Sequence, residues 1–276
     1  MPNYSILDRK IITISGPDRK NFLQGLITND INCLNHKNPI IYSLMLTATG
    51  GFLYDFFISE NGDKIYLDIE DKKSEEILKK LSLYKLSANI ELKIIDDFKI
   101  IFLDQENDEI QYFYDPRNKK LGFRAILDQN NLQNIQNNPN FTKQNIDFYN
   151  KIRFDLRIPD HNDLIQKKSI PAEYGFFDLN CINFEKGCYI GQEVMARIKY
   201  KGVIRKKIYL TKILGKNQFN KGDEITLKDR KIGNILSHIS YDGQIISLSL
   251  LKNAIIDENP KAKLQLNDNQ IIPIIT

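Results

Sequence analysis

The residues from Val203 onward are the part of the chain that most restricts its fold. Short stretches rich in Ile and Leu alternate there with polar turn sequences at regular intervals. The turn sequences are Lys221-Gly222-Asp223, Asp229-Arg230, Tyr241-Asp242-Gly243 and Asn267-Asp268-Asn269. Short strands with turn signals between them are typical of a small β-barrel or sandwich. We therefore predict a C-terminal all-β domain, a β-barrel, over residues 201–276.

The first part of the chain mixes strands with helices. Strands rich in β-branched or aromatic residues are predicted at 10–15, 40–46, 52–59 and 64–69. One helix is predicted to begin at Ser15-Gly16-Pro17-Asp18, and Asp71 is predicted to cap a second helix that runs to Leu83. Because strands and helices do not alternate regularly, this order favours an α+β sheet layer over a doubly wound parallel sheet.

The middle of the chain continues this pattern less regularly. Residues 91–103 and 110–114 are predicted as further strands. Residues 129–144 are rich in Asn and Gln and are predicted as a polar surface connection, either a loop or a short helix. Ile146, Tyr149, Ile152 and Leu156 have helical spacing, and Pro159 is expected to end that helix. These elements complete an α+β body over residues 1–200.

Length and composition are those of a globular protein with about two domains. The chain has 276 residues, 42% of them hydrophobic and 27% charged, and a net charge of +4 that permits an anionic ligand or RNA. No apolar run reaches the ~18 residues of a membrane span, and residues 1–5 resemble neither a signal peptide nor a transit peptide. Three cysteines do not make an even disulfide framework. We expect a cytoplasmic protein that has no membrane contact.

Several common classes of site have no support in the sequence. The three histidines are scattered and no Cys-x-x-Cys pair occurs, so we predict no permanent zinc or iron–sulfur site. Neither a Gly-x-Gly-x-x-Gly sequence nor a Walker loop is present, so a nucleotide-binding fold is not predicted. No RRM, KH or helix-turn-helix signature is present either.

Residues 184–193, which read Phe-Glu-Lys-Gly-Cys-Tyr-Ile-Gly-Gln-Glu, form the most distinctive run in the chain. We call this run the signature loop. Its two glycines allow a tight connection that presents Cys188. Lys186 could favour the thiolate form of Cys188, which is the nucleophile and the metal ligand. The alternative interpretation is that Cys188 is a small, buried and inert hydrophobic residue.

The run Lys-Gly-Cys-Tyr-x-Gly-Gln-Glu resembles the signature of the YgfZ family of folate-binding proteins. This family is related to GcvT, the aminomethyltransferase of the glycine cleavage system. Further matches are Gly16-Pro17-Asp18, residues 22–30, Asp115-Pro116-Arg117 and residues 121–124. The resemblance covers nearly the whole chain. It implies a GcvT-like body of two α+β segments, about 1–95 and 96–200, around a central opening that holds folate, followed by a β-barrel.

The resemblance also implies candidate folate-binding residues. Asp55 matches an acidic residue that approaches the folate nitrogens, although strand alternation alone favours a side chain that faces solvent. Glu173 matches a glutamate that holds the pterin ring, and its alternative is a surface or helix-start glutamate. Tyr149 falls where the family places an aromatic residue against folate, and its alternative is core packing. Arg9 replaces a second aromatic residue, and could stack or pair with a glutamate tail.

The signature loop and the residues after it supply further candidates. Lys186 and Cys188, together with Asp55, are the candidate catalytic residues. Tyr189, Gln192, Glu193 and Arg197 are implied as further contacts to the cofactor. A basic run then follows, made of Arg197, Lys199, Lys201, Arg205, Lys206 and Lys207. These cations could hold the polyglutamate tail of folate or RNA phosphates, and their alternative is an ordinary solvated face.

The resemblance implies a protein that binds tetrahydrofolate or a one-carbon derivative. Its role would be iron–sulfur cluster assembly or repair for a subset of enzymes, including enzymes that modify tRNA. The expected partners are iron–sulfur client or assembly proteins, with a tRNA contact as a further prospect, and Cys188 could transiently ligate a cluster. A folate-dependent one-carbon transferase acting on tRNA or protein is the first alternative, and Tyr54 disfavours it by replacing a second acidic residue. An RNA-binding module is the second alternative.

Overall fold

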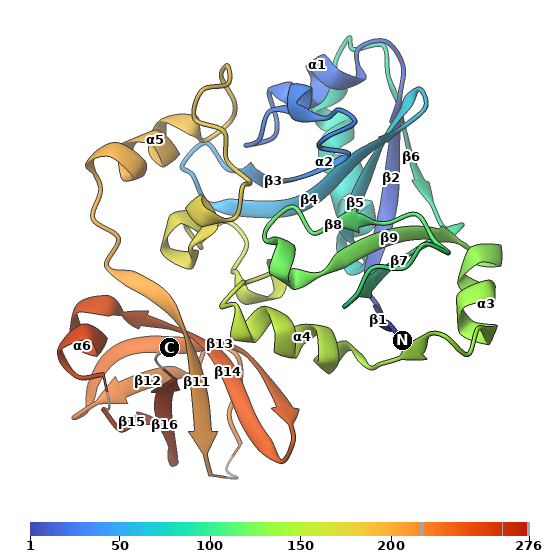
Figure 1. The fold of residues 1–276 in the computed structure, drawn as a ribbon. Helices are drawn as coiled ribbons and strands as arrows, with labels where there is room; N and C mark the ends of the chain where they lie inside the picture. Colours follow the sequence, from blue (N-terminus) through green and yellow to red (C-terminus); the bar gives the residue numbers. More distant parts are fainter. Residues whose placement is uncertain (216–217, 261, 275–276) are drawn as a thin grey trace.

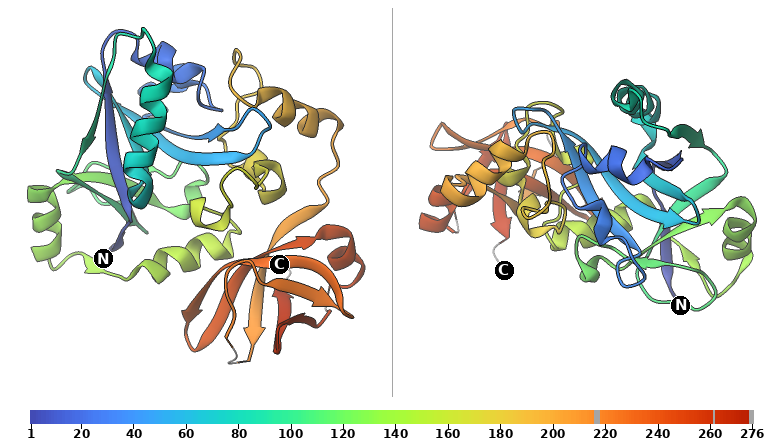
Figure 2. Two further views of the ribbon diagram at one scale, coloured as in Figure 1. Left: turned by 180° about the vertical axis from the view of Figure 1, so that it is seen from behind. Right: turned by 90° about the horizontal axis from the view of Figure 1, so that it is seen from above.

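The computed structural model describes residues 1–215, 218–260 and 262–274. It contains two five-stranded sheets and one closed barrel. Figure 1 shows the sheets and their helices in one body, with the barrel in orange and red beside it, and Figure 2 shows the same division from behind and from above. The predicted α+β body with a C-terminal β-barrel is confirmed.

The first sheet has the strand order β3-β4-β5-β2-β6, and its neighbouring strands are antiparallel. Its strands are β2 (Arg9–Ser15), β3 (Ile40–Leu46), β4 (Phe52–Asn61), β5 (Lys64–Glu70) and β6 (Glu91–Ile95). Its helices are α1 (Arg19–Gln24) and α2 (Ser74–Lys85). β3 is buried at all seven positions because apolar clusters cover both faces of the sheet. The side chains of β4 therefore face protein on both sides from Phe52 to Ser59.

The second sheet has the order β10-β1-β7-β9-β8. Its strands are β1 (Asn3–Ile6), β7 (Phe98–Leu103), β8 (Phe113–Tyr114), β9 (Phe123–Asp128) and β10 (Thr142–Lys143). The helices that follow β9 are α3 (Gln129–Asn137) and α4 (Ile146–Asp155). β1 comes from the N-terminus but pairs with β7 and β10, so the first residues of the chain belong to this sheet. The predicted segment boundaries near 95 and 200 stay predictions.

The predicted strand over 91–103 is wrong in one respect. It is two strands, β6 in the first sheet and β7 in the second, with Asp96 and Asp97 between them. Two adjacent carboxylates are costly to bury, so the chain leaves one sheet there and enters the other. The prediction over 110–114 is too long, because only Phe113 and Tyr114 pair with β9.

Two helix predictions need adjustment. Asp71 does not cap α2; it opens a 3-10 turn, Asp71–Lys73, and α2 begins at Ser74. The Asn- and Gln-rich stretch contains α3, in agreement with the short-helix alternative. The Asp128 side chain accepts a hydrogen bond from the backbone N–H of Asn131, and Ile135 is buried. A side-chain cap and one buried contact thus stabilise a helix of low intrinsic propensity.

The barrel has the closed strand order β11-β14-β13-β12-β15-β16. Its strands are β11 (Lys206–Leu214), β12 (Glu224–Leu227), β13 (Arg230–Tyr241), β14 (Gln244–Lys252), β15 (Leu264–Leu266) and β16 (Asn269–Ile274), and α6 (Asn253–Glu258) follows β14. β11 closes the barrel by pairing with both β14 and β16. The hairpin between β13 and β14 turns at Asp242 and Gly243, with φ of 48° and 70°. Two successive positive φ values suit a tight two-residue hairpin turn.

The segment between the body and the barrel contains little regular structure. Three short 3-10 turns lie in the described part of this segment: η4 (His161–Asp163), η5 (Pro171–Tyr174) and η6 (Phe176–Asp178). Earlier in the chain, η1 (Ile31–Cys33) follows α1 and η3 (Lys119–Leu121) precedes β9. The signature loop follows η6 and leads into α5 (Gln192–Lys201), which precedes β11. Of the helices in the described part of the chain, none has the length and apolar character that crossing a bilayer requires.

Candidate functional site

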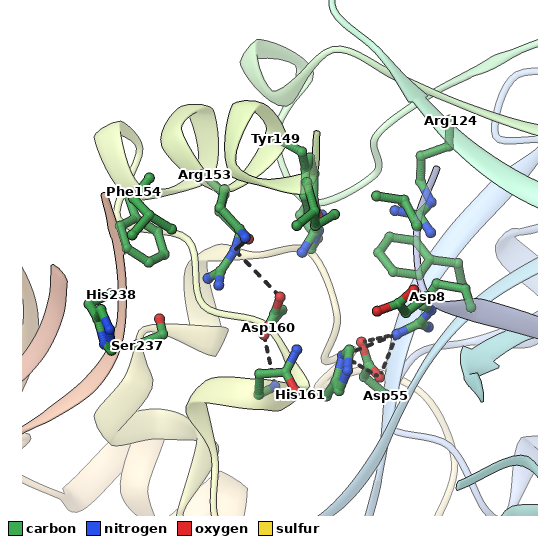
Figure 3. A pocket seen from close by; sticks show the side chains of 18 residues that line it. Asp8, Asp55, Arg124, Tyr149, Arg153, Phe154, Asp160, His161, Ser237 and His238 are labelled. Carbon is green, nitrogen blue, oxygen red and sulfur yellow. Dashed lines mark hydrogen bonds and ion pairs between the residues drawn. The ribbon is translucent and has the colours of Figure 1, made fainter. Parts of the chain in front are cut away.

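A cavity of about 200 Å³ lies where both sheets, α4 and the barrel meet. We call it the central cavity. Arg9 of β2 and Asp55 of β4 line it from the first sheet, Arg124 of β9 from the second, and Tyr149 from α4. Figure 3 shows Tyr149 and Arg153 reaching down from α4, with Ser237 and His238 on the barrel side. The cavity is therefore built from segments that are distant in the sequence.

Arg9 and Asp55, two of the predicted site residues, meet in this cavity. Nη1 of Arg9 donates to both carboxylate oxygens of Asp55, at 3.0 and 3.1 Å. The Nε of Arg9 donates to Oδ1 of Asp68 at 2.6 Å, and its Nη2 donates to the Asp68 carbonyl at 2.7 Å. Arg9 and Asp55 are both buried. Arg9 thus joins β2 to β4 and β5 through a buried ion-pair network.

Asp55 is held in its ionised form. Oδ2 of Asp55 accepts a hydrogen bond from the Tyr42 hydroxyl at 3.2 Å, and Nδ1 of His161 lies 3.9 Å from Oδ1. Burial opposes ionisation, but the attraction of Arg9 and His161 outweighs it and holds the pKa of Asp55 below its ordinary value. At neutral pH the carboxylate therefore carries a negative charge and has no proton to give.

Three guanidinium groups surround the ring of Phe57. The Cζ atoms of Arg9, Arg117 and Arg124 lie 5.2, 4.9 and 3.6 Å from the ring centroid. Such cation–π contacts stabilise charge more strongly when the groups are removed from water. Nη2 of Arg124 donates to Oδ2 of Asp68 at 2.5 Å. One wall of the central cavity is thus a desolvated arginine cluster that is paired with buried carboxylates, of which Asp55 also lines the cavity.

Tyr149 packs in the core and also lines the central cavity, and its contact with folate stays a prediction. Its ring packs against Phe102, with centroids 5.1 Å apart, so it belongs to the core. Its hydroxyl accepts a hydrogen bond from Nη2 of Arg117 at 2.7 Å, and Arg117 is itself bound to Asp115 at 2.7 Å. Tyr149 also lines the central cavity. The hydrogen bond fixes the ring, so an aromatic face would be presented to a ligand without rearrangement.

The barrel is attached to the cavity through a second ion-pair group. Nη1 of Arg153 on α4 donates to Oδ2 of Asp163 at 2.7 Å, and Nε lies 3.4 Å from Oδ2 of Asp160. The Ser237 hydroxyl of β13 donates to the other oxygen of Asp163. Arg153 outweighs the effect of burial and lowers the pKa of Asp160 to about 2. These carboxylates link α4, η4 and the barrel.

Glu173 does not line the central cavity. It is on η5 and lines a separate groove of about 500 Å³ beside α5 and the start of β11. Its Oε2 lies 3.5 Å from the ammonium of Lys206. Lys199 and Lys207 line the same groove. Glu173 is therefore not brought together with Arg9, Asp55 and Tyr149, and its role as a pterin ligand stays a prediction.

Lys186 of the signature loop is buried beneath the loop between α1 and η1. Its Nζ donates to the carbonyl oxygens of Gln24, Ile27 and Asn29 at 2.7, 2.8 and 2.8 Å. Burial lowers the pKa of its ammonium group to about 8. All three donors of a protonated lysine are thus used within the protein. This geometry gives Lys186 a structural role, and its catalytic role stays a prediction.

Cys188 is exposed, so the alternative of a buried cysteine at this position is wrong. The buried cysteine is Cys181 of the same region. Gly191 has φ of 86°, and a Cβ atom there would lie 2.7 Å from the Thr47 carbonyl oxygen. Gly187 has no positive φ, and a Cβ atom there would meet no other atom within 4 Å. One of the two glycines, not both, is therefore required by the path of the chain.

The other candidates from the signature loop lie outside the lining of the central cavity. Tyr189 is buried, and its hydroxyl finds no hydrogen-bond partner among the described residues. Oε1 of Gln192 accepts from the backbone N–H of Tyr189 at 3.4 Å. Glu193 and Arg197 lie on α5, and both are exposed. Contacts of these four residues with a cofactor stay predictions.

Sequence reasoning missed several residues of the central cavity. Arg153, Asp160 and His161 were not candidates, and Arg124 was noticed only as part of the family resemblance. A local signal existed for one of them. Asp160 and Asp163 form a capping box around η4, which is visible in the sequence as two aspartates three residues apart. Nothing local indicates that this turn faces Arg9.

The cavity suits part of a folate rather than the whole molecule. Its volume, about 200 Å³, lies below the ~300–1,000 Å³ of typical ligand pockets. Its lining combines the Tyr149 ring with charged groups of both signs. Nε of Arg124 is buried and has no hydrogen-bond partner in the part of the chain that the structure describes. These residues fit one planar, polar ring system, with the remainder of the ligand outside.

The sequence was compared with known proteins. No family model matches it. The iron–sulfur cluster assembly factor IBA57 homolog of Neurospora crassa is 31% identical over 229 residues, which are 74% of this chain and 52% of that protein. The same factor from Pyricularia oryzae is 28% identical over 219 residues, which are 74% of this chain and 55% of that protein. The chain thus spans about half the length of these relatives.

A bacterial relative matches over a larger share of both chains. The tRNA-modifying protein YgfZ of Aliivibrio fischeri is 27% identical over 290 residues, which cover 96% of this chain and 90% of that protein. Among solved structures, the glycine cleavage system aminomethyltransferase T from Bartonella henselae is similar, with a TM-score of 0.76, 12% identity, and coverage of 100% of this chain and 85% of that one. At this identity the likeness shows a GcvT-like fold alone. By its sequence relatives and its fold, the chain belongs to the YgfZ/GcvT-like family.

Proposed function

We propose that this protein binds tetrahydrofolate, or a one-carbon derivative of it, and acts in the assembly or repair of iron–sulfur clusters. Its clients would include enzymes that modify tRNA. The names of the relatives support this role, since they are an iron–sulfur cluster assembly factor and a tRNA-modifying protein. A cytoplasmic location and the individual client proteins stay predictions.

The observation that carries the folate proposal is the meeting of Arg9, Asp55 and Tyr149 in one cavity at the junction of the sheets and the barrel. In this proposal Tyr149 offers a fixed ring face to the pterin. Asp55 offers negative charge near the ring nitrogens. The arginines on the cavity wall would attract the carboxylates of the glutamate tail at longer range. Bound folate would supply a carrier for a one-carbon group.

The state of Asp55 argues against the one-carbon transferase alternative. General acid catalysis at neutral pH needs a group whose pKa lies near the working pH. The pKa of Asp55 is lowered, and Nη1 of Arg9 contacts both of its oxygens. This carboxylate is therefore better suited to hold a ligand than to move a proton. We favour the maturation role for that reason.

In the proposed role, Cys188 contacts a partner protein or its cluster rather than the folate ring. Cys188 is exposed on the signature loop, whereas Cys181 is buried. The usual iron–sulfur cluster has four cysteine ligands. Partners or small thiols would supply the ligands that one cysteine cannot. The cluster in this view is cargo that passes to a client.

The test is calorimetric titration of the purified protein with tetrahydrofolate, alongside Tyr149→Ala, Tyr149→Phe, Glu173→Ala and Cys188→Ala. We expect saturable binding that Tyr149→Ala weakens by at least about tenfold, because it loses the stacking face. Tyr149→Phe keeps the ring and should bind within about threefold of the unmodified protein. Cys188→Ala should bind normally, since Cys188 is not among the residues that line the cavity.

Two outcomes would contradict the proposal. If Glu173→Ala abolishes binding while Tyr149→Ala does not, folate occupies the groove beside α5 and not the central cavity. If no variant and no concentration gives saturable binding, the protein does not bind folate. The fold would then serve cluster maturation without that cofactor, and the maturation role would need support from client enzymes alone.

A further inference from the structure

A second cavity, with a volume of about 720 Å³, shares no lining residue with the central cavity. It lies between two connecting segments, residues 29–41 and residues 112–119, and Asn180 completes it. Its volume falls within the ~300–1,000 Å³ of typical ligand pockets. Neither the folate proposal nor the signature loop uses this cavity, so its chemistry can be considered separately.

One wall of the second cavity is aromatic. Tyr112 and Tyr114 contribute rings to it, and Phe113, which also lines the cavity, packs against the main hydrophobic cluster. Phe123 supports two of these rings, with centroids 4.9 Å from Tyr112 and 4.7 Å from Tyr114. Tyr114 is still 44% exposed. Supported but exposed aromatic rings offer stacking surface at little cost in conformational entropy, because few rotatable bonds remain to be fixed.

Basic side chains form another part of the lining. Lys37, Lys119 and His36 line the cavity. Nζ of Lys119 lies 5.4 Å from the centroid of the Tyr114 ring. Among the described residues, neither Lys37 nor Lys119 forms an ion pair. The acidic residue in the lining is Asp115, and Arg117 already neutralises it at 2.7 Å. The lining thus joins an aromatic surface to positive charge, and the carboxylate nearest this surface outside the lining, Glu106, accepts a hydrogen bond from the Tyr114 hydroxyl.

Side-chain amides complete the lining. Oδ1 of Asn118 accepts from the backbone N–H of Lys120 at 2.9 Å, which orients the side chain. Within residues 1–215, 218–260 and 262–274, the NH₂ group of Asn118 and the whole amide of Asn38 have no hydrogen-bond partner. Amides both donate and accept, so they can read the polar edge of a base.

We infer that the second cavity binds a nucleotide, either free or as an unpaired nucleotide of RNA. The base would stack on the Tyr112–Tyr114 wall, the amides would meet its polar edge, and Lys37 and Lys119 would hold the phosphate. A pterin fits less well, because its aminopyrimidine edge pairs best with a free carboxylate. The single carboxylate of this lining is occupied by Arg117.

The ligand is tested by fluorescence anisotropy with a labelled single-stranded oligouridylate of about ten nucleotides, a length typical of single-strand sites. Uridine and adenosine 5′-monophosphates serve as competitors, as does a duplex RNA of equal length. We expect saturable binding of the single strand that the duplex does not displace. Competition by a mononucleotide at micromolar concentration identifies a free nucleotide as the ligand, and competition only by single-stranded RNA identifies an RNA site.

Substitutions of residues that line the second cavity test whether the ligand binds there. Tyr114→Ala should weaken binding by about tenfold or more, as expected for loss of one stacking partner. Tyr114→Phe keeps the ring and loses only the hydroxyl contact to Glu106, so it should bind within about twofold. Removing both Lys37 and Lys119 should make the salt dependence shallower by about 0.7 in the log–log slope, because the two cations hold one phosphate and each neutralised phosphate contributes ~0.7. Lys206→Ala with Lys207→Ala, in the groove beside α5, is the matched charge control.

Cys33 provides an independent readout, because it lines the second cavity and is partly exposed. In the Cys188→Ser background, saturating nucleotide or RNA should slow alkylation of Cys33 by iodoacetamide severalfold. Two results would overturn the inference. One is an absence of saturable binding to any of these probes. The other is binding that survives Tyr114→Ala but falls with the Lys206 and Lys207 control pair. Because tetrahydrofolate is not a component of the assay, failure here is distinct from failure of the folate proposal.

Discussion

The central cavity and the signature loop differ in how easily each is recognised and in what each holds. The signature loop is a run of ten consecutive residues, and its sequence alone indicates the family. The central cavity is assembled from β2, β4, β9, α4, η4 and β13, and no short motif describes it. Yet four buried arginines line the cavity, while the loop exposes one cysteine and buries one lysine.

This difference shows that a recognisable motif need not be a ligand site. Lys186 and Gly191 have structural reasons to be present, because one satisfies three carbonyl oxygens and the other allows a close approach to Thr47. Cys188 is exposed, so its thiol can contact another molecule. If this distinction between the central cavity and the signature loop is correct, substitutions in the cavity ion pairs and at Lys186 lower the free energy of unfolding. Substitutions at Cys188 leave it unchanged.

The largest effect is expected from Asp68→Asn, which leaves Arg9 and Arg124 without their shared buried counter-charge. Breaking a buried pair by removing one partner typically costs ~3–5 kcal/mol. Urea unfolding should show that loss in the free energy of unfolding. Glu224→Gln removes an exposed ion pair with Lys231 and serves as the control, with an expected change within ~0.5 kcal/mol. A loss below ~1 kcal/mol for Asp68→Asn would mean that the network does not stabilise the cavity wall.

Lys186→Met comes next. It removes three hydrogen bonds to carbonyl oxygens in the loop between α1 and η1. At about 1 kcal/mol for each bond, we expect a loss of about 3 kcal/mol in the free energy of unfolding. Lys201→Met, at an exposed position of α5, is the matched control and should change little. Normal stability of Lys186→Met, together with lost function, would instead restore the catalytic role predicted for Lys186.

Acid sensitivity gives a third, smaller effect. The folded-state pKa of Asp160 is about 2, below its ordinary value of 3.8, so its contribution is present above pH 4 and is lost as the pH falls toward 2. Asp160→Asn should remove about 2 kcal/mol of stability at pH 6 and about half of that at pH 3. Urea unfolding of both proteins at the two pH values measures this. An equal loss at pH 6 and pH 3 would show that ionisation of Asp160 is not the cause.

The smallest effect on stability is expected at Cys188. Cys188→Ser should change the free energy of unfolding by no more than ~0.5 kcal/mol, as is usual for exposed positions. Iodoacetamide should modify Cys188 in the folded protein. Cys181 should resist until the protein unfolds, because it is buried and burial raises the pKa of its thiol. Mass spectrometry of the alkylated peptides distinguishes the two, and a reactive Cys181 in the folded state would contradict this assignment.

Much of the fold could be predicted because its signals are local. The strand predicted at 40–46 matches β3, and turn residues such as Asp242-Gly243 marked the ends of the barrel strands. The errors occur where a decision depends on distant partners. Residues 91–103 look like one strand, yet β6 and β7 pair with different sheets. The same holds for the residues of the central cavity. Asp55 and Tyr149 could be predicted through the family resemblance, whereas no local sequence pattern indicated His161 or Arg153.

The sequence by itself therefore determined the class of fold, the barrel and the family, because periodicity, turn residues and a long motif are all short-range features. Only the tertiary structure decided which charges meet. Arg9 and Asp55 are 46 positions apart, and Arg9 and His161 are 152 positions apart, yet both pairs make contact. In the same way it separated Glu173 from the cavity and buried Lys186 beside an exposed Cys188. Burial and ion pairing depend on how the sheets and the barrel pack together, and no local pattern encodes that packing.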